Sequence, residues 1–365
     1  MSRGARATVD LAALRANLRA AREAAGEQRR LMAVVKSDGY GHGLARVAGA
    51  LAPGADAFAV TDLAEAMALR SAGLRHPVVL LQGPFSTEEL APAAEQGLEL
   101  VIHSAWQVEA LAAARLPEPV GVWLKVDTGM HRLGFPPEAV ADTWRRLAEA
   151  PSVRSEVGFL THLACADDRD DPMTERQLAA FEAACAGLPG PRSAANSAGL
   201  LGWPASRYDW VRPGIMLYGA SPFSDGRRGH APLRPAMALE GQLVAINRHA
   251  AGEPVGYGAT WRCPEAMPVG VVSIGYGDGY PRHAPSGTPV QVAGQRTQVV
   301  GRVSMDMVAV DLRGLTGVEI GAPALLWGEG VPPEEVAAAA GTIAYELFCR
   351  VPPRPGRRYT DSEAG

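Results

Sequence analysis

The sequence has few cysteines and no long apolar run, and these two absences exclude several classes of protein. Its four cysteines, Cys165, Cys185, Cys263 and Cys349, are scattered through 365 residues, so neither a disulfide scaffold nor a metal site is expected. No segment approaches the roughly 20 apolar residues of a membrane span, and the arginine-bearing amino terminus lacks the apolar stretch of a signal peptide. We therefore expect a cytoplasmic protein with reduced thiols and no membrane association.

The chain also lacks an excess of positive charge. Its formal net charge is -4, and no run of Lys and Arg is interleaved with aromatic side chains, which disfavours nucleic acid as a partner. Hydrophobic residues make up 47% of the sequence and charged residues 20%, which is ordinary for a globular protein with a buried core. The length accommodates a barrel of about 250 residues and a smaller module.

The first two-thirds of the sequence alternates short apolar runs with amphipathic, alanine-rich stretches such as 62–71 and 174–186. This alternation predicts repeated βα units. Eight strands in this order predict an α/β fold with a closed, TIM-like (β/α)8 barrel over residues 1–233. The expected strands lie near 32–36, 57–60, 78–81, 99–102, 121–126, 156–160, 192–196 and 211–217.

After residue 233 the sequence pattern changes to strand-like segments separated by Gly and Pro. This pattern predicts a mainly β carboxyl-terminal domain over residues 234–365. The expected strands are 239–246, 269–274, 297–300, 307–311 and 322–326. The tail over 350–365 is rich in Pro, Arg and Gly and is expected to end in a disordered stub.

Lys36 stands at the end of the first barrel strand, in AVVKSDGYGHG (33–43). Active sites of this fold collect at the carboxyl end of the strands. Burial there lowers the pKa of a lysine and makes its amine competent to form a Schiff base with an aldehyde cofactor. For the lysine alone, a stem packed on apolar surface with its ammonium in water remains an alternative.

The motif around Lys36 closely resembles the cofactor-lysine signature of alanine racemases, which are fold III pyridoxal-phosphate enzymes with a barrel and a β domain. The resemblance continues in the family's order through VWLKVDTGMHRLGF, THLACAD, ANSAG, VRPGIMLYG, SIGYGDGYPR and VGRVSMDM, and covers nearly the whole chain. It implies a homodimer with shared active sites that interconverts L-alanine and D-alanine. Two bases would remove and return a proton on a pyridoxal-phosphate external aldimine, for peptidoglycan precursor supply or for D-alanine catabolism.

Five positions of the barrel resemble the family's cofactor contacts. Lys36 would hold pyridoxal phosphate as an internal aldimine, and the phosphate would be contacted by Tyr40, by Ser197 and by the backbone of Gly214 and Ile215. Phosphate prefers N–H groups and hydroxyls at the seventh and eighth barrel loops. Without the resemblance, the tyrosine would be an amphipathic surface aromatic and ANSAG a helix N-cap.

Arg212 resembles the arginine that faces the pyridine nitrogen of the cofactor. Because an arginine keeps its proton, that nitrogen is expected to stay unprotonated. The cofactor would then be a weak electron sink, which disfavours transamination and decarboxylation and leaves proton removal and return. A surface ion pair before Pro213 is the alternative for this arginine.

Three further barrel residues resemble parts of the family's site. His162 would pack against the cofactor ring and hydrogen-bond toward the catalytic tyrosine, while Arg132 would touch the cofactor phenolate and the substrate carboxylate. Lys125 matches a lysine that is often carbamylated, which would convert a repelling cation into an anion that orients the arginine. A plain surface pairing of Lys125 with Asp127 is the alternative.

In the β domain, Tyr276 of SIGYGDGYPR resembles the second catalytic base, and Met305 and Asp306 resemble residues that meet the substrate carboxylate. Two bases on opposite faces explain racemisation. A tyrosine with its usual pKa of about 10 is a poor base, so His162 is expected to assist it. In isolation GYGDGY is a turn between strands.

One stretch departs from the family's pattern. Many relatives place a phosphate-binding tyrosine shortly after the run that matches YELFC, but here Arg350, Val351, Pro352 and Pro353 follow. That hydroxyl is therefore expected to be missing.

Three other functions share parts of this pattern. A non-catalytic pyridoxal-phosphate-binding barrel would lack the β domain, and a fold III decarboxylase would not be expected to carry VRPGIMLYG and GYGDGY. A racemase of serine, lysine or broad specificity remains open, because motifs do not report pocket size.

Overall fold

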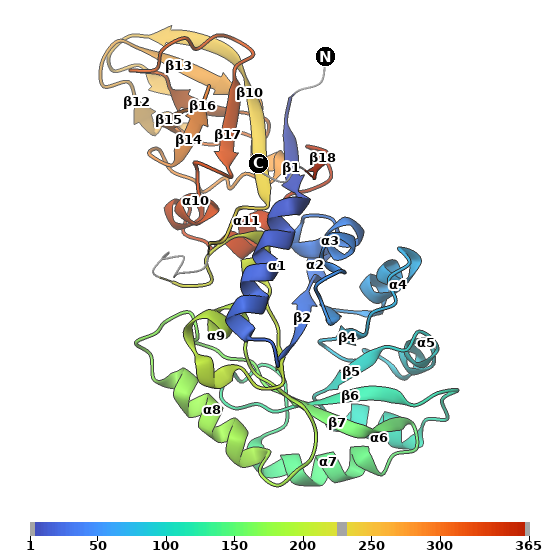
Figure 1. Ribbon diagram of the computed structural model, residues 1–365. Coiled ribbons are helices and arrows are strands. Elements are labelled where there is room, and N and C mark those ends of the chain that lie inside the picture. The colour runs from blue at the N-terminus through green and yellow to red at the C-terminus, as the bar shows by residue number, and fades with distance from the viewer. Residues whose placement is uncertain (1–3, 225–231, 362–365) are drawn as a thin grey trace.

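The computed structural model describes residues 4–224 and 232–361, which form a barrel and a β-rich domain (Figure 1). Eight parallel strands close the barrel, in the number and order predicted. They are β2 (Arg30–Val34), β3 (Ala57–Val60), β4 (Val78–Leu80), β5 (Glu99–Ile102), β6 (Val120–Lys125), β7 (Val153–Leu160), β8 (Arg192–Ser193) and β9 (Trp210–Val211). The prediction for the last strand is wrong in extent. The strand ends at Val211, although the Pro213 carbonyl still accepts from the Val34 N–H at 3.0 Å, because the backbone leaves the extended conformation at Gly214 (φ -122°, ψ -95°) and η4 (Ile215–Tyr218) follows as a 3-10 helix.

Helices surround the barrel, and side-chain caps mark the start of some of them. The Asp10 carboxylate accepts hydrogen bonds from the N–H groups of Ala12 and Ala13 at the start of α1, and Asp62 caps α4 by accepting from Glu65. The predicted helices at 62–71 and 174–186 correspond to α4 and α8. The barrel helices are α1 (Leu11–Ala25), α3 (Leu44–Leu51), α4 (Leu63–Ser71), α5 (Leu90–Glu95), α6 (Ala105–Ala113), α7 (Val140–Ala148), α8 (Met173–Ala184) and α9 (Ser197–Gly202).

The second domain is built on an eight-stranded sheet. It contains the five predicted segments, as β10 (Met237–His249), β13 (Met267–Val272), β15 (Gln295–Gln298), β16 (Val308–Asp311) and β17 (Pro323–Trp327), together with β1 (Arg6–Asp10), β14 (Pro289–Val292) and β18 (Arg357–Thr360). β11 (Pro254–Val255) pairs separately with β12 (Trp261–Arg262), and two helices follow, α10 (Pro333–Ala339) and α11 (Ala344–Cys349).

The first and last strands of the described chain lie side by side where the two domains meet (Figure 1). β1 pairs antiparallel with β10 and parallel with β18, with Val9 opposite Tyr359. β1 therefore joins the sheet of the second domain although it precedes the barrel in sequence. Within the tail, this pairing orders residues 357–360, and the expectation that the tail ends in a disordered stub concerns its last residues, of which 362–365 lie outside the described part of the chain.

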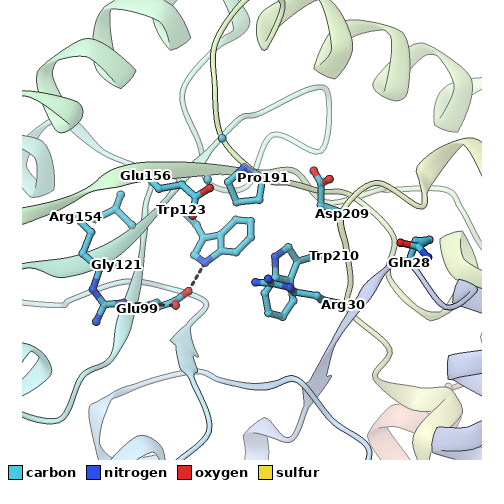
Figure 2. Close-up of a pocket in the computed structure, with 13 residues that line it drawn as sticks. Gln28, Arg30, Glu99, Gly121, Trp123, Arg154, Glu156, Pro191, Asp209 and Trp210 are labelled. Atoms are coloured by element: carbon cyan, nitrogen blue, oxygen red, sulfur yellow. Dashed lines mark hydrogen bonds and ion pairs between the residues drawn. The ribbon is translucent and has the colours of Figure 1, made fainter.

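The amino-terminal end of the barrel holds a cavity of about 510 Å³ whose charged and aromatic side chains pair with one another (Figure 2). The Trp123 indole N–H donates to Glu99 at 2.7 Å, and the Arg30 guanidinium lies 5.3 Å from the centre of the Trp210 ring. Active sites of this fold lie at the other end of the strands, and the residues at this end mainly support stability.

The described cysteines are all free thiols. Cys185 and Cys263 are buried, Cys165 is half-buried and Cys349 is exposed. In the two described ranges, no helix is long and apolar enough to cross a bilayer.

Candidate active site

A cavity of about 440 Å³ opens at the carboxyl end of the barrel strands, a size typical of small-molecule sites. It brings together all nine barrel residues that the sequence predicted, although they come from six separate segments of the chain. These residues are Lys36, Tyr40, Lys125, Arg132, His162, Ser197, Arg212, Gly214 and Ile215.

The cavity is strongly cationic. Lys36, Lys125, Arg132 and Arg212 line it, and none of the described lining residues carries a carboxylate. The sequence contains only two lysines among its 35 basic residues, and both are in this cavity. A pocket with four cations and no anion favours a ligand that carries several negative charges, and its two amines are the only lysine side chains in the chain that could bond to an aldehyde.

Burial and mutual repulsion act on these cations. Burial, and then the neighbouring Arg212 and Arg132, lower the pKa of Lys125 to about 8. Burial and Arg132 also lower the pKa of Lys36. The pKa of His162 falls well below its usual value, because the ring is buried among the same cations. The imidazole is therefore neutral near pH 7, and a substantial part of Lys125 is a neutral amine.

Lys36 begins a short turn of unusual hand. α2 (Lys36–Tyr40) has φ angles of 55° at Ser37, 55° at Asp38, 62° at Gly39 and 48° at Tyr40, with ψ angles of 45–49° at the first three. This is one turn of left-handed helix, a conformation that L-residues adopt at a cost of roughly 1–2 kcal/mol each. The turn places both Lys36 and Tyr40 in the cavity lining.

A cluster of hydroxyl groups and amides forms one wall. Ser197 Oγ accepts hydrogen bonds from the N–H groups of Gly214 at 2.8 Å and Met216 at 3.3 Å, which leaves its own O–H to donate. A Cβ on Gly214 would lie 2.7 Å from the Tyr40 hydroxyl, so glycine keeps this space open. The wall therefore has room and donors for a small oxyanion.

Tyr345 was missed by the sequence analysis. It is the first residue of YELFC itself, at the start of α11, and it lines the cavity with its ring centre 6.0 Å from that of Tyr40. No tyrosine directly follows the motif, as expected, but Tyr345 within the motif lines the cavity in its place. Burial raises the pKa of both tyrosines, so both keep a proton to donate.

Arg212 is fixed by neutral oxygens. Its guanidinium donates to Ser193 Oγ at 2.5 Å, to the Thr161 carbonyl at 2.6 Å and to the Ala194 carbonyl at 3.2 Å. Burial lowers its pKa to about 10, which leaves the group protonated at neutral pH. The surface ion pair considered for this residue is excluded, because the side chain is buried and all three of these acceptors are uncharged.

The three predicted residues of the second domain lie together but outside this cavity. Tyr276 donates its backbone N–H to Ser304, and Gly277 donates to the carbonyl of Met305. The Asp306 carboxylate is paired with Arg354. Tyr276 and Met305 are 38% and 54% exposed, so within one chain this group lies at the surface and not in the cavity lining with Lys36 and Tyr40.

Two family models match the chain almost from end to end. One, described as the alanine racemase N-terminal domain, matches residues 9–222. The other, described as the alanine racemase C-terminal domain, matches residues 236–359. Together they span both the barrel and the β-rich domain.

Curated proteins and solved structures resemble the chain over its full length. The alanine racemase of Halorhodospira halophila is 73% identical over 363 residues, with 100% of both chains covered. The catabolic alanine racemase of Pseudomonas putida is 50% identical and covers 96% of this chain and 97% of its own length. The crystal structure of the biosynthetic alanine racemase from Pseudomonas aeruginosa superposes with a TM-score of 0.95 at 48% identity, covering 98% of this chain and 100% of that one.

Proposed function

The chain belongs to the alanine racemase family, and on this premise we propose that it interconverts L-alanine and D-alanine with pyridoxal phosphate bound in the cationic cavity. The observation that carries the proposal is the composition of that cavity, with four cations, no carboxylate and both lysines of the chain. Relatives described as biosynthetic and as catabolic are both similar to this chain, so either physiological role agrees with the proposal.

The residues present fit pyridoxal phosphate. Tyr40, Ser197 and Tyr345 offer hydroxyl donors, and Gly214 leaves open space beside the Tyr40 hydroxyl, which suits the phosphate. Lys36 would hold the aldehyde carbon, because it lies in the cavity with a lowered pKa. When bound, the cofactor would withdraw electrons from the substrate's α-carbon and make its C–H bond acidic.

Arg212 sets which reactions are favoured at the cofactor ring. Its three hydrogen bonds hold the guanidinium charged and in place. A cationic donor beside a ring nitrogen prevents that nitrogen from taking a proton. This arrangement favours rapid return of a proton to the α-carbon over transamination or decarboxylation.

Lys36 and Tyr276 are the two proposed proton carriers. One takes the α-proton of L-alanine while the other gives a proton to the opposite face, and the reverse reaction exchanges their roles. Arg132, Met305 and Asp306 are proposed to bind the substrate carboxylate. His162, which is neutral in the cavity, is proposed to hydrogen-bond toward the Tyr276 hydroxyl and so to assist it.

This assignment requires two copies of the chain. Tyr276 and Met305 are exposed in the second domain, whereas Lys36 lies at the barrel mouth. We propose a twofold dimer in which the Tyr276 face of each chain closes the cavity of the other. Three further exposed apolar residues, Tyr257, Met307 and Ile343, provide contact surface for such an interface.

Covalent labelling tests the cofactor assignment. Borohydride reduction of the purified protein with pyridoxal phosphate, followed by peptide mapping, is expected to place the label on Lys36. Because the chain has two lysines, Lys125 serves as an internal control. A label on Lys125, or none, would reject the assignment.

Subunit exchange tests the shared site. Lys36→Ala and Tyr276→Ala homodimers should both be nearly inactive, but a heterodimer concentrates both lesions in one site and leaves the other intact. Random reassociation of equal amounts should restore roughly a quarter of wild-type activity in a D-alanine assay. No recovery, with heterodimers proven by two affinity tags, would reject sharing.

A further inference from the structure

The turn that carries Lys36 is packed against the far end of the chain. We define the lysine loop as residues 36–43 and the carboxyl-terminal clasp as Phe348, Arg357 and Tyr359. The clasp residues follow the lysine loop by more than 300 positions in sequence, yet they contact it directly. β18, which carries two of them, is held in place by its parallel pairing with β1.

Two glycines of the lysine loop are required by this contact. A Cβ on Gly41 would lie 2.0 Å from the carbonyl oxygen of Phe348, and a Cβ on Gly43 would lie 2.1 Å from the hydroxyl of Tyr359. Both glycines have positive φ, 75° and 97°. The close approach therefore explains why the lysine motif needs glycine at positions that do not line the cavity.

Polar contacts from the clasp reach both halves of the lysine loop. Arg357 Nη1 lies 2.7 Å from Asp38 Oδ2, while Asp38 Oδ1 accepts the N–H of Leu44 at 2.8 Å. The Tyr359 hydroxyl donates to the His42 carbonyl at 3.1 Å. These contacts fix the two ends of the loop segment that follows Lys36.

The buried His42 ring lies between the clasp and Tyr40 of the cavity lining. It lies edge-on to Phe348, with ring centres 5.1 Å apart, and its Nδ1 is 2.8 Å from the carbonyl oxygen of Tyr40. Because a carbonyl only accepts, Nδ1 carries the ring proton and donates. Tyr40 is thereby held between the cavity on one side and the clasp on the other.

From these contacts we infer that Arg357 and Tyr359 are positioning residues for the lysine loop. The loop contains three non-glycine residues with left-handed backbone, a conformation that persists only where the surroundings impose it. The clasp supplies that constraint by holding Asp38 and the His42 carbonyl. Lys36 and Tyr40 are then aimed into the cavity before any ligand binds. The inference rests on the proposed function for the part that concerns pyridoxal phosphate.

Hydrogen exchange of the full-length protein without added cofactor tests the clasp alone. The N–H groups of Gly39, Gly41 and Gly43 donate to the carbonyls of Val35, Ser37 and Asp38, so their exchange reports on the turn. Arg357→Met should speed exchange in peptides covering 36–44 about three- to tenfold, as expected for loss of a half-buried ion pair. Peptides covering β6 should not change. Tyr359→Phe removes only the hydroxyl that donates to the His42 carbonyl, and it should also speed exchange in these peptides.

Cofactor release tests the consequence at the site. Pyridoxal-phosphate dissociation, followed by absorbance, should be about three- to tenfold faster in Arg357→Met, and Arg357→Lys should restore much of the difference because it keeps the charge. Arg358→Met is the matched control: its residue is the next on β18 and is exposed. The double variant Asp38→Asn, Arg357→Met should release cofactor little faster than either single variant, because the two residues form one ion pair.

Two outcomes would overturn the inference. If hydrogen exchange in Arg357→Met rises equally in all peptides, Arg357 has a general structural role. If Arg357→Met releases cofactor no faster than Arg358→Met, Arg357 has no effect on the site. Failure of the proposed function would look different. Wild-type protein would then bind no pyridoxal phosphate at Lys36, while the exchange measurement would still report on the clasp.

Discussion

The lowered pKa of Lys125 predicts that its side chain reacts with dissolved CO2 to form a carbamate. The reaction needs the neutral amine. With a pKa of about 8, about a quarter of the amine is neutral at pH 7.5, against about one part in a thousand for an ordinary lysine. The cavity therefore raises the reactive fraction by about two orders of magnitude.

The same neighbours that repel the ammonium would stabilise the product. Arg212 and Arg132 both act to lower the pKa of Lys125 because they are cations close to it. A carbamate is an anion, so both interactions change from repulsion to attraction when CO2 adds. The carbamate would then hold the Arg132 guanidinium where the substrate carboxylate is proposed to bind.

Carbon-13 NMR with labelled bicarbonate measures this directly. The chain has two lysines, and Lys36 is proposed to be occupied by the cofactor in the loaded protein, so Lys125 and the amino terminus are the remaining amines. A carbamate resonance should appear at pH 8 and weaken at pH 6.5, and in Lys125→Met, whose side chain keeps the apolar stem, it should fall to the contribution of the amino terminus. The amino terminus contributes equally to both proteins.

Activity should follow the same modification. Wild-type protein in CO2-free buffer should racemise more slowly and recover when bicarbonate is added, with a larger change in KM than in kcat if Arg132 binds the substrate carboxylate. Lys125→Met should be insensitive to bicarbonate. A carbamate signal of equal size in both proteins, or none in either, would refute the reasoning from the lowered pKa.

Other groups in the cavity make equally specific predictions. Ser197→Ala leaves the N–H groups of Gly214 and Met216 without their acceptor, so urea titration should give a loss of about 1–3 kcal/mol in the free energy of unfolding, and cofactor affinity should fall. Arg212→Met should cost at least as much, because three buried oxygens lose their donor, and Arg212→Lys should cost less because it keeps the charge; equal losses would show that the forked geometry, not the charge, matters. Between pH 8 and 10.5 the unfolded chain keeps the Lys125 proton that the folded chain has lost. The free energy of unfolding of the cofactor-free protein in CO2-free buffer should therefore rise with pH over this range. The rise should exceed that of Lys125→Met by up to about 3 kcal/mol. Parallel curves for the two proteins would mean that the folded pKa is not lowered.

The barrel was predictable because its strands carry their own signal. Ala57–Val60 is a wholly buried AFAV run, the pattern of a parallel strand covered on both faces. β1 and β18 carry no such signal. Their sequences, RATVD and RRYT, are short and largely polar, and each is a strand because of a partner some 350 residues away in sequence. Pairing of this kind is a tertiary effect that local pattern does not report.

The site residues also differ in whether local sequence could place them. Lys36, Ser197 and Arg212 were placed from motifs, since each stands at the end of a recognisable barrel strand. Tyr345 was missed because it enters the cavity from α11 of the second domain, which no periodicity connects to the barrel. The pKa of Lys125 was likewise beyond sequence reasoning, because it depends on where Arg212 and Arg132 lie in space.

The carboxyl-terminal segment has a particular position in the proposed dimer. Arg354 pairs with Asp306 and lies 3.7 Å from Asp278 in the Tyr276 turn, whereas Arg357 and Tyr359, a few residues later, hold the lysine loop of the same chain. If Tyr276 serves the partner's cavity, the span from 354 to 359 contacts machinery of two different sites. One chain's segment would then position the lysine of its own site and the tyrosine of the other. A displacement of β18 along β1 would accordingly affect both sites of the dimer.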